Sequence, residues 1–256
     1  MKYLRTTDLA RAAGVHPNTV RRYAEWGLLP PVQRGANGYR LFTQQHLDCM
    51  RVARVIYIST YPGRALRLSA SKIIQCAVAD DWGAALERGY THLAFVQAER
   101  AQAETAATLL ERWAAGTAAD AAEQPMRIGQ VARLLGLSID VLRNWEHNGF
   151  ITTPRNENNG YRVYGPAEIS RLRVIRMLGR AGYSQMAILR MLLQLDQGVT
   201  THLRHWLDTP SPDEDAHAAA DRWLSTLAEQ EEFAQRLVAL IEEIIKARTT
   251  GKAWPI

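Results

Sequence analysis

Apolar residues recur every three or four positions through most of this chain, a spacing that predicts amphipathic helices. The clearest stretch covers residues 126–190, where two short helical patterns meet at Gly136, a residue that suits a tight turn. An Asn159-Gly160 pair between apolar and aromatic flanks then predicts a hairpin, and two further helical patterns follow. The pattern predicts a mainly all-α fold in which small β-wings interrupt the helices.

This pattern occurs twice. A shift of 122 positions places residues 5–51 on residues 127–173 without a gap. Identical residues then coincide at the turns, on the second helix and in the hairpin: Ala10, Gly14, Arg21, Gly27, Asn37, Gly38, Tyr39 and Arg40 meet Ala132, Gly136, Arg143, Gly149, Asn159, Gly160, Tyr161 and Arg162. A gapless internal repeat of this kind indicates two copies of one structural module.

Both stretches resemble the DNA-binding domain of the mercury-resistance-regulator (MerR) family, a winged helix-turn-helix. The resemblance covers about the first 75 residues and residues 126–197. It implies a sequence-specific transcriptional regulator with two tandem DNA-binding domains, which bends or untwists promoter DNA. Its expected partners are double-stranded promoter DNA and RNA polymerase.

The second helix of each repeat is the candidate DNA-reading element, because an α-helix fits the major groove and Asn and Arg side chains pair with base edges. The candidate reading residues lie near its start: His16, Asn18, Thr19, Arg21 and Arg22 in the first repeat, and Ser138, Asp140, Arg143 and Asn144 in the second. Simpler roles exist, since His16 and Asn18 could cap the helix and Arg21 could pair with Glu25. Arg143 repeats Arg21 whereas Glu25 becomes His147, which favours DNA contact for this arginine.

The resemblance implies that the wing and a late aromatic of the second helix hold the phosphate backbone. These roles fall on Tyr23, Asn37, Tyr39 and Arg40, and on Trp145, Asn159, Tyr161 and Arg162. Such contacts position a protein on DNA without reading sequence. Tyr23 could instead face inward, and Trp145 departs from the family pattern because an indole can donate but not accept. Phe42 and Tyr164 are expected in the core beneath each wing.

Basic residues concentrate in the two repeats. Residues 1–75 hold 12 Lys/Arg against 3 Asp/Glu, a net charge of +9, and residues 126–197 hold 10 against 5, a net charge of +5. The stretches that follow them are acidic, with −5 over residues 76–125 and −4 over residues 198–256. Charge runs are usually only solvated faces, but here charge and motif agree, as in a nucleic-acid footprint.

Two long helical patterns, over residues 86–115 and 214–248, follow the repeats. The second has a heptad seam whose candidate pairing positions are Trp223, Leu227, Ala234, Leu237, Ile241 and Ile244. In the family, this helix pairs antiparallel with the copy in a partner chain. Because both copies stand in one chain here, we expect a monomeric pseudo-dimer, with a homodimer through residues 214–248 as the alternative.

With 256 residues, two or three small domains are expected. We expect the first repeat over residues 1–80, a long connecting helix over 81–115, a linker over 116–125, the second repeat over 126–197, and a short helix with the pairing helix over 198–256. Within the first repeat, the third helix is expected over residues 44–60 and the fourth near residues 69–80.

Other classes of function find little support. Cys49 and Cys76 lack the spacing of a thiolate metal site, and no phosphate loop or nucleophile–base arrangement indicates an enzyme. We therefore expect neither metal nor cofactor. Tryptophans outside the motifs could line a ligand cleft or simply pack helices together. The lack of a signal peptide or a long apolar run predicts a cytoplasmic protein.

Two alternatives use the same features. An excisionase-like architectural DNA-binding protein has the same fold, and clustered sites beside an attachment site would favour it. A protein-interaction antagonist of another regulator would keep the fold with vestigial DNA surfaces, and failure to bind DNA at low salt would favour that interpretation.

Overall fold

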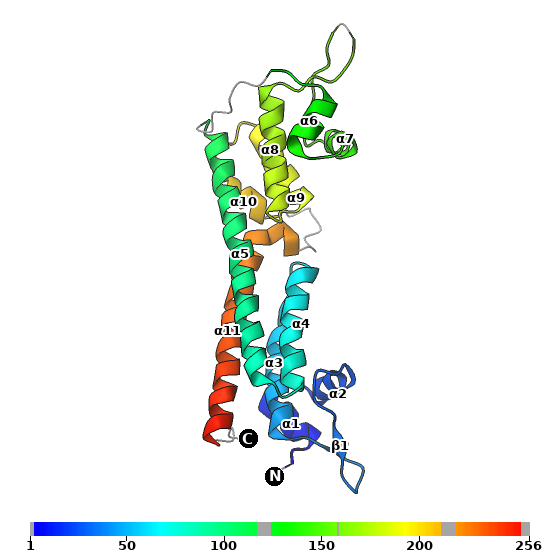
Figure 1. Cartoon of the computed structure of the whole chain (residues 1–256), viewed down its shortest axis with the longest axis vertical. Helices are drawn as coiled ribbons and strands as arrows, with labels where there is room; N and C mark the ends of the chain where they lie inside the picture. The colour runs from blue at the N-terminus through cyan, green and yellow to red at the C-terminus, as the bar shows by residue number, and fades with distance from the viewer. Residues whose placement is uncertain (1–2, 117–123, 158, 211–218, 252–256) are drawn as a thin grey trace. The chain divides into compact units, whose positions relative to one another are not determined.

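The computed structural model describes residues 3–116, 124–157, 159–210 and 219–251. The fold is mainly helical, as predicted, and the described part of the chain contains one two-stranded antiparallel sheet. The chain forms two compact units (Figure 1). Unit 1 comprises Met1–Ala98 and Leu227–Ile256, and unit 2 comprises Glu99–Thr226.

Unit 1 contains the whole first repeat. Its elements are α1 (Thr6–Ala13), α2 (Pro17–Glu25), β1 (Gln33–Arg34), β2 (Arg40–Leu41), α3 (Gln44–Ile58) and α4 (Arg64–Val78). Gly14, at φ 64°, ends α1 in the left-handed conformation, and the chain then turns into α2. The strands pair with Gln33 opposite Leu41, and Leu4 bridges to Phe42 below the wing. Val20, Phe42 and Met50 are fully buried between these elements.

Unit 2 repeats this arrangement. Its elements are α6 (Ile128–Leu135), α7 (Ile139–His147), α8 (Pro166–Arg180) and α9 (Gln185–Asp196), followed by α10 (Leu203–Asp208) and a short 3₁₀ helix, η1 (Ala219–Arg222). The second wing is held by single bridges, Arg155 with Arg162 and Met126 with Tyr164. Leu142 and Leu172 are buried at the positions of Val20 and Met50.

The two long helices are shared between the units. α5 (Trp82–Ala114) gives its first part to unit 1 and its second part to unit 2, whereas α11 (Trp223–Thr250) lies almost entirely in unit 1. Leu237, Ile241 and Ile244 of α11 belong to the same buried cluster as the first repeat. In unit 2, the hydroxyl of Tyr183 donates to the carbonyl of Ala103 in α5. Each repeat is therefore completed by part of the long helix that follows the other repeat.

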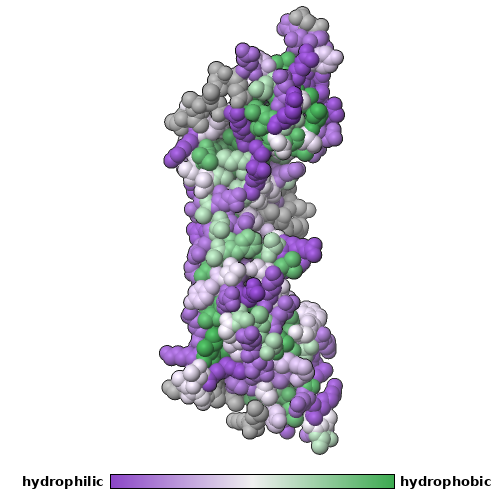
Figure 2. Space-filling view, in the orientation of Figure 1, coloured by the Kyte–Doolittle hydropathy of each residue, from purple (hydrophilic) through white to green (hydrophobic). Residues whose placement is uncertain are grey.

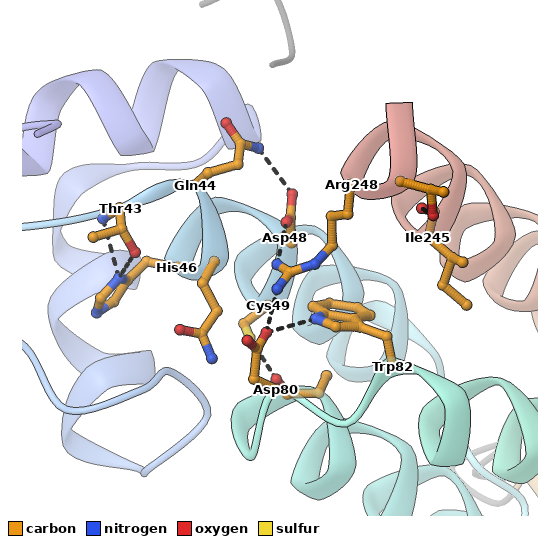
Figure 3. Close-up of polar contacts among 12 residues, drawn as sticks. Thr43, Gln44, His46, Asp48, Cys49, Asp80, Trp82, Ile245 and Arg248 are labelled. Carbon is orange, nitrogen blue, oxygen red and sulfur yellow. Dashed lines mark hydrogen bonds and ion pairs between the residues drawn. The ribbon is translucent and has the colours of Figure 1, made fainter. Parts of the chain in front are cut away.

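A polar cluster fastens α11 to the first repeat (Figure 3). The guanidinium of Arg248 lies 3.4 Å from the carboxylate of Asp48 and 2.6 Å from that of Asp80. Trp82 donates its indole N–H to Asp80 over 2.8 Å, and Gln44 donates to Asp48 over 2.9 Å. Burial raises the pKa of Asp48, which is 1% exposed. The cluster joins α3, the turn before α5 and the end of α11.

The position equivalent to Asp48 in the second repeat also makes a contact with a long helix. Asp48 becomes Ser170 under the shift of 122, and the indole N–H of Trp113 in α5 donates to the Ser170 hydroxyl over 2.6 Å. Two chemically different contacts thus hold the ends of α11 and α5 at the same place on the two repeats.

The fourth helix of the first repeat begins at Arg64, five residues before the predicted start, so that boundary was wrong. Gly63, at φ 144°, ends the non-helical segment between α3 and α4, and Leu66 in the first turn of α4 is already buried. Most of the predicted linker, residues 117–123, and residues 211–218, where the last helix was expected to begin, lie outside the described residues. The six candidate pairing residues of α11 are all buried.

Candidate nucleic-acid interface

The start of α2 presents polar side chains that are tied to one another. His16 is the N-cap, and its Nδ1 accepts from the backbone N–H of Asn18 over 3.2 Å. The Oδ1 of Asn18 in turn accepts from the guanidinium of Arg21 over 2.9 Å. All three are exposed. His16 therefore has the capping role, while Asn18 and Arg21 form an exposed hydrogen-bonded pair.

The other two candidates on α2 differ in access. Arg22 is exposed and its guanidinium lies 5.2 Å from the ring centre of Trp26, whereas Thr19 is half-buried. Trp26 is 56% exposed. The sequence comparison did not single out Trp26, because the second repeat has Asn148 in its place.

The start of α7 has the same plan with different chemistry. Ser138 is the N-cap and its hydroxyl accepts from the backbone N–H of Val141. Arg143 lies 3.4 Å from Asp140, as Arg21 lies beside Asn18, and both side chains are highly exposed. Asn144 accepts from the side chain of Asn148 over 2.7 Å. The repeat therefore preserves the arginine and changes the group beside it from an amide to a carboxylate.

The late aromatic residues are less accessible than the resemblance implied. Tyr23 is 8% exposed, its ring centre lies 6.0 Å from that of Trp26, and burial raises its pKa. Its ring faces inward, which leaves little of it for a phosphate. Trp145 is half-buried on α7.

The wing tips match closely in the two repeats. Asn37 and Asn159 each accept from the backbone N–H two residues ahead, and Gly38 and Gly160 follow at φ 78° and 68°. These positive angles favour glycine and set the next side chain outward. Tyr39 and Tyr161 are both 64% exposed, with the guanidinium of Arg5 or Arg127 about 6 Å from the ring. Figure 2 shows mainly hydrophilic residues around the second wing.

The wing arginines differ between the repeats. Arg40 is half-buried on β2. Its counterpart Arg162 donates to the carboxylate of Glu146 on α7 over 2.5 Å. Glu146 occupies the position of Ala24, so the first repeat has no carboxylate there. Sequence reasoning missed this pair, which offsets part of the positive charge of Arg162.

Phe42 and Tyr164 are 0% and 1% exposed beneath the wings. Their backbones pair with Leu4 and Met126, which tie the chain before each helix-turn-helix to the base of its wing. The core role predicted for both rings agrees with this burial.

Both modules match a known family. The model described as "MerR HTH family regulatory protein" matches residues 4–56 and residues 126–195. Both repeats belong to the MerR family. The two matched segments are the two repeats; they cover α1, α2 and most of α3 in unit 1, and α6 to α8 and most of α9 in unit 2.

Relatives of this chain are named as transcription regulators. It is 27% identical over 135 residues to the HTH-type transcriptional repressor CarH of Myxococcus xanthus, covering 52% of this chain and 44% of the relative. It is 42% identical over 48 residues to the HTH-type transcriptional regulator CueR of Escherichia coli, covering 19% and 36%. A mercuric resistance operon regulatory protein of Pseudomonas fluorescens is 26% identical over 122 residues, covering 48% and 76%. The chain thus spans less than half the length of the first two relatives.

No solved structure is significantly similar to this chain. Within the described ranges, no helix is long and apolar enough to span a bilayer. Nor do the described residues bring together three or more His, Cys, Asp or Glu side chains able to hold a metal ion. Cys49 is buried and Cys76 half-buried, and both are free thiols.

Proposed function

We propose that this protein is a sequence-specific DNA-binding transcriptional regulator in which one chain supplies both DNA-binding modules. The observation that carries the proposal is the exposed pair at the start of each second helix, Asn18 with Arg21 and Asp140 with Arg143. In each unit this pair belongs to the same module as an exposed wing tyrosine. A module of this kind can read bases with the helix and hold phosphates with the wing.

The pairing of the long helices within unit 1 supports a monomeric pseudo-dimer. The hydroxyl of Tyr90 in α5 donates to Glu242 in α11, and Gln97 donates to Glu231. A Cβ added at Gly89 would lie 3.3 Å from Val238, so glycine permits a close approach of the helices there. Since Leu237, Ile241 and Ile244 are already buried, this part of the seam has a partner within the chain.

We further propose that binding bends or untwists the promoter, as in the family. A deformation of this kind costs a few kcal/mol, which the contacts of two modules would have to offset. RNA polymerase at the same promoter is the partner that would respond to the altered DNA.

The test combines operator selection with a mass measurement. Duplexes selected from random DNA should bind with one chain per operator, as measured by light scattering of the free protein and of the complex. The free protein should have a mass near 28.8 kDa. A free protein of twice that mass would contradict the pseudo-dimer, and failure to select any duplex at low salt would contradict the regulator itself.

A further inference from the structure

Each unit contains a cavity at an equivalent place. In unit 1 a cavity of about 610 Å³ lies between the end of α1, the outer face of α3 and α11. In unit 2 a cavity of about 600 Å³ lies between α8 and the second part of α5. We call these the α3 cavity and the α8 cavity.

One wall of each cavity is built from residues that are equivalent under the internal repeat. Arg51, Arg54, Val55 and Ile58 line the α3 cavity, and their counterparts at a shift of 122, Arg173, Arg176, Met177 and Arg180, line the α8 cavity. The opposite wall comes from a long helix in both cases. Phe233, Arg236 and Leu240 of α11 form it in unit 1, and Ala106 and Leu109 of α5 help form it in unit 2. The same construction, made twice from different residues, is a built feature of the fold.

The lining combines guanidinium groups with apolar surface. Arg11, Arg51, Arg54 and Arg236 line the α3 cavity, and three arginines line the α8 cavity. No acidic side chain is among the described residues that line either one. The half-exposed carboxylate of Glu243 lies 3.8 Å from Arg51. Ile58 and Leu109 remain 64% and 43% exposed at the cavities. Guanidinium forks suit carboxylate, sulfonate or phosphate oxygens, and the apolar residues suit a hydrocarbon or aromatic body.

We propose that each unit binds one organic anion with an apolar body, in the α3 cavity and in the α8 cavity. A DNA phosphate would satisfy the arginines but would make no apolar contact with Phe233, Leu240 or Leu109, which line the cavities. The apolar walls therefore favour an amphipathic small molecule over nucleic acid.

The α3 cavity connects directly to the helix-turn-helix. The guanidinium of Arg54 donates to the carbonyl of Ala13, the last residue of α1, over 2.7 Å. It also lies against Gly14, where an added Cβ would stand 2.6 Å from its Nη1; Arg176 lies against Gly136 in the same way, at 3.5 Å. An anion that takes Arg54 from Ala13 loosens the turn that leads into α2. Ligand and operator therefore oppose each other's binding, a coupling that rests on the proposed function.

The direct test uses the intact chain and 8-anilinonaphthalene-1-sulfonate as the probe. Calorimetry and fluorescence measure how many probe molecules bind and how tightly. The neutral N-phenyl-1-naphthylamine, which has the same rings without the sulfonate, is the matched control ligand. We expect two sulfonate sites per chain and at least about tenfold weaker binding of the neutral compound. Equal binding of both compounds would overturn the proposal, because the arginines would then contribute nothing.

Variants assign the sites. Arg236→Met and Arg180→Met each remove one exposed guanidinium from one cavity and lie outside α2, α7 and the wings. Each should weaken one of the two sites about tenfold and leave the other unchanged. Arg88→Met, an exposed arginine of α5 outside both cavities, should change neither. Unchanged probe binding in both cavity variants would overturn the assignment. If the variants also lowered the salt dependence of DNA binding, these arginines would contact DNA phosphates instead.

Operator binding separates this inference from the proposed function. With a selected operator, saturating sulfonate probe should raise the operator dissociation constant several-fold in the wild type and less in Arg236→Met. If no operator can be selected but two sulfonate sites remain, the regulator proposal fails and the cavities stand. If operators bind and the probe does not, the cavity proposal fails alone.

Discussion

Arg248, near the end of the last helix, lies 3.4 Å from the carboxylate of Asp48, which is almost fully buried in the first repeat. The two residues are 200 positions apart. The arginine supplies positive charge to a carboxylate whose pKa is raised by burial. A buried carboxylate that loses its partner leaves an uncompensated charge, so this contact is more consequential than an exposed ion pair.

Arg248→Met should lower the free energy of unfolding by about 1–3 kcal/mol near neutral pH, because Asp48 stays buried without its ion pair. Since burial raises the pKa of Asp48 in the folded state, the folded protein binds a proton at this carboxylate more readily than the unfolded chain does. The deficit should therefore shrink as the pH falls towards 4. Urea unfolding at several pH values measures this. Lys246→Met, on the exposed face of the same helix, is the control, and an equal loss in both variants would contradict the role of Asp48.

A second prediction concerns His92 of α5, which is 2% exposed beside Tyr61 and whose pKa burial lowers to about 4. A histidine with a lowered folded pKa contributes stability above its ordinary value of 6.5, and loses it as the pH falls through that value towards 4. The wild type should lose about 1.4 kcal/mol per pH unit from this group at most. His92→Leu should flatten the profile, leaving the smaller contribution of His46, whose pKa is also lowered by burial.

His147→Leu, on the exposed surface of α7, provides the matched comparison for His92→Leu. Thermal unfolding between pH 7 and pH 4 would follow all three proteins. If His92→Leu kept the slope of the wild type, the acid sensitivity would have another origin.

The wing arginines give a third prediction. Arg40→Ala and Arg162→Ala should each weaken binding to every DNA sequence, by about tenfold, and lower the slope of log affinity against log salt by about 1, because a phosphate contact is lost. Anisotropy titrations over a range of salt concentrations measure both. A change in base preference with an intact salt slope would show that the arginine reads bases instead.

Among the described residues, only the second wing arginine has a carboxylate beside it, so a change at Glu146 should affect Arg162 alone. Glu146→Ala releases Arg162 from its carboxylate and removes a negative charge near the DNA, so affinity should rise about threefold. Glu229→Ala, which makes the same change in net charge on the exposed face of α11, should leave affinity nearly unchanged. Weaker binding after Glu146→Ala would mean that the carboxylate positions Arg162 for its contact.

A fourth prediction is that the two modules read different sequences. The exposed partner of the shared arginine is an amide in Asn18 and a carboxylate in Asp140, and these groups suit different base edges. Operators selected from random duplex DNA should therefore have unlike halves. The double variant Asn18→Asp and Asp140→Asn should move the sequence preferred by each module towards that preferred by the other. A perfect palindrome protected by one chain would contradict this.

Much of the local structure could be predicted because it depends on neighbouring residues. The glycines at the turns, the spacing of apolar residues and the Gly-Tyr-Arg of each wing are all local signals. The Arg162–Glu146 pair was not predictable in this way, because Glu146 aligns with Ala24 and comparison of the repeats hides it. The apolar seam of α11 could be recognised, but a seam does not identify what it packs against. Its place on the first repeat depends on contacts such as Gln230 with Thr60, which lie far apart in the sequence.

The sharing of the long helices has a consequence for protein synthesis. Leu237, Ile241 and Ile244 are translated long after the first repeat, yet they belong to the same core as Met50 and Trp82. At about 5–20 residues per second, the apolar face of the first repeat waits on the order of ten seconds for them. During that time it is a natural client for a chaperone, and a chain released early would never acquire its cover. The first repeat leaves the ribosome before the second but is completed after it.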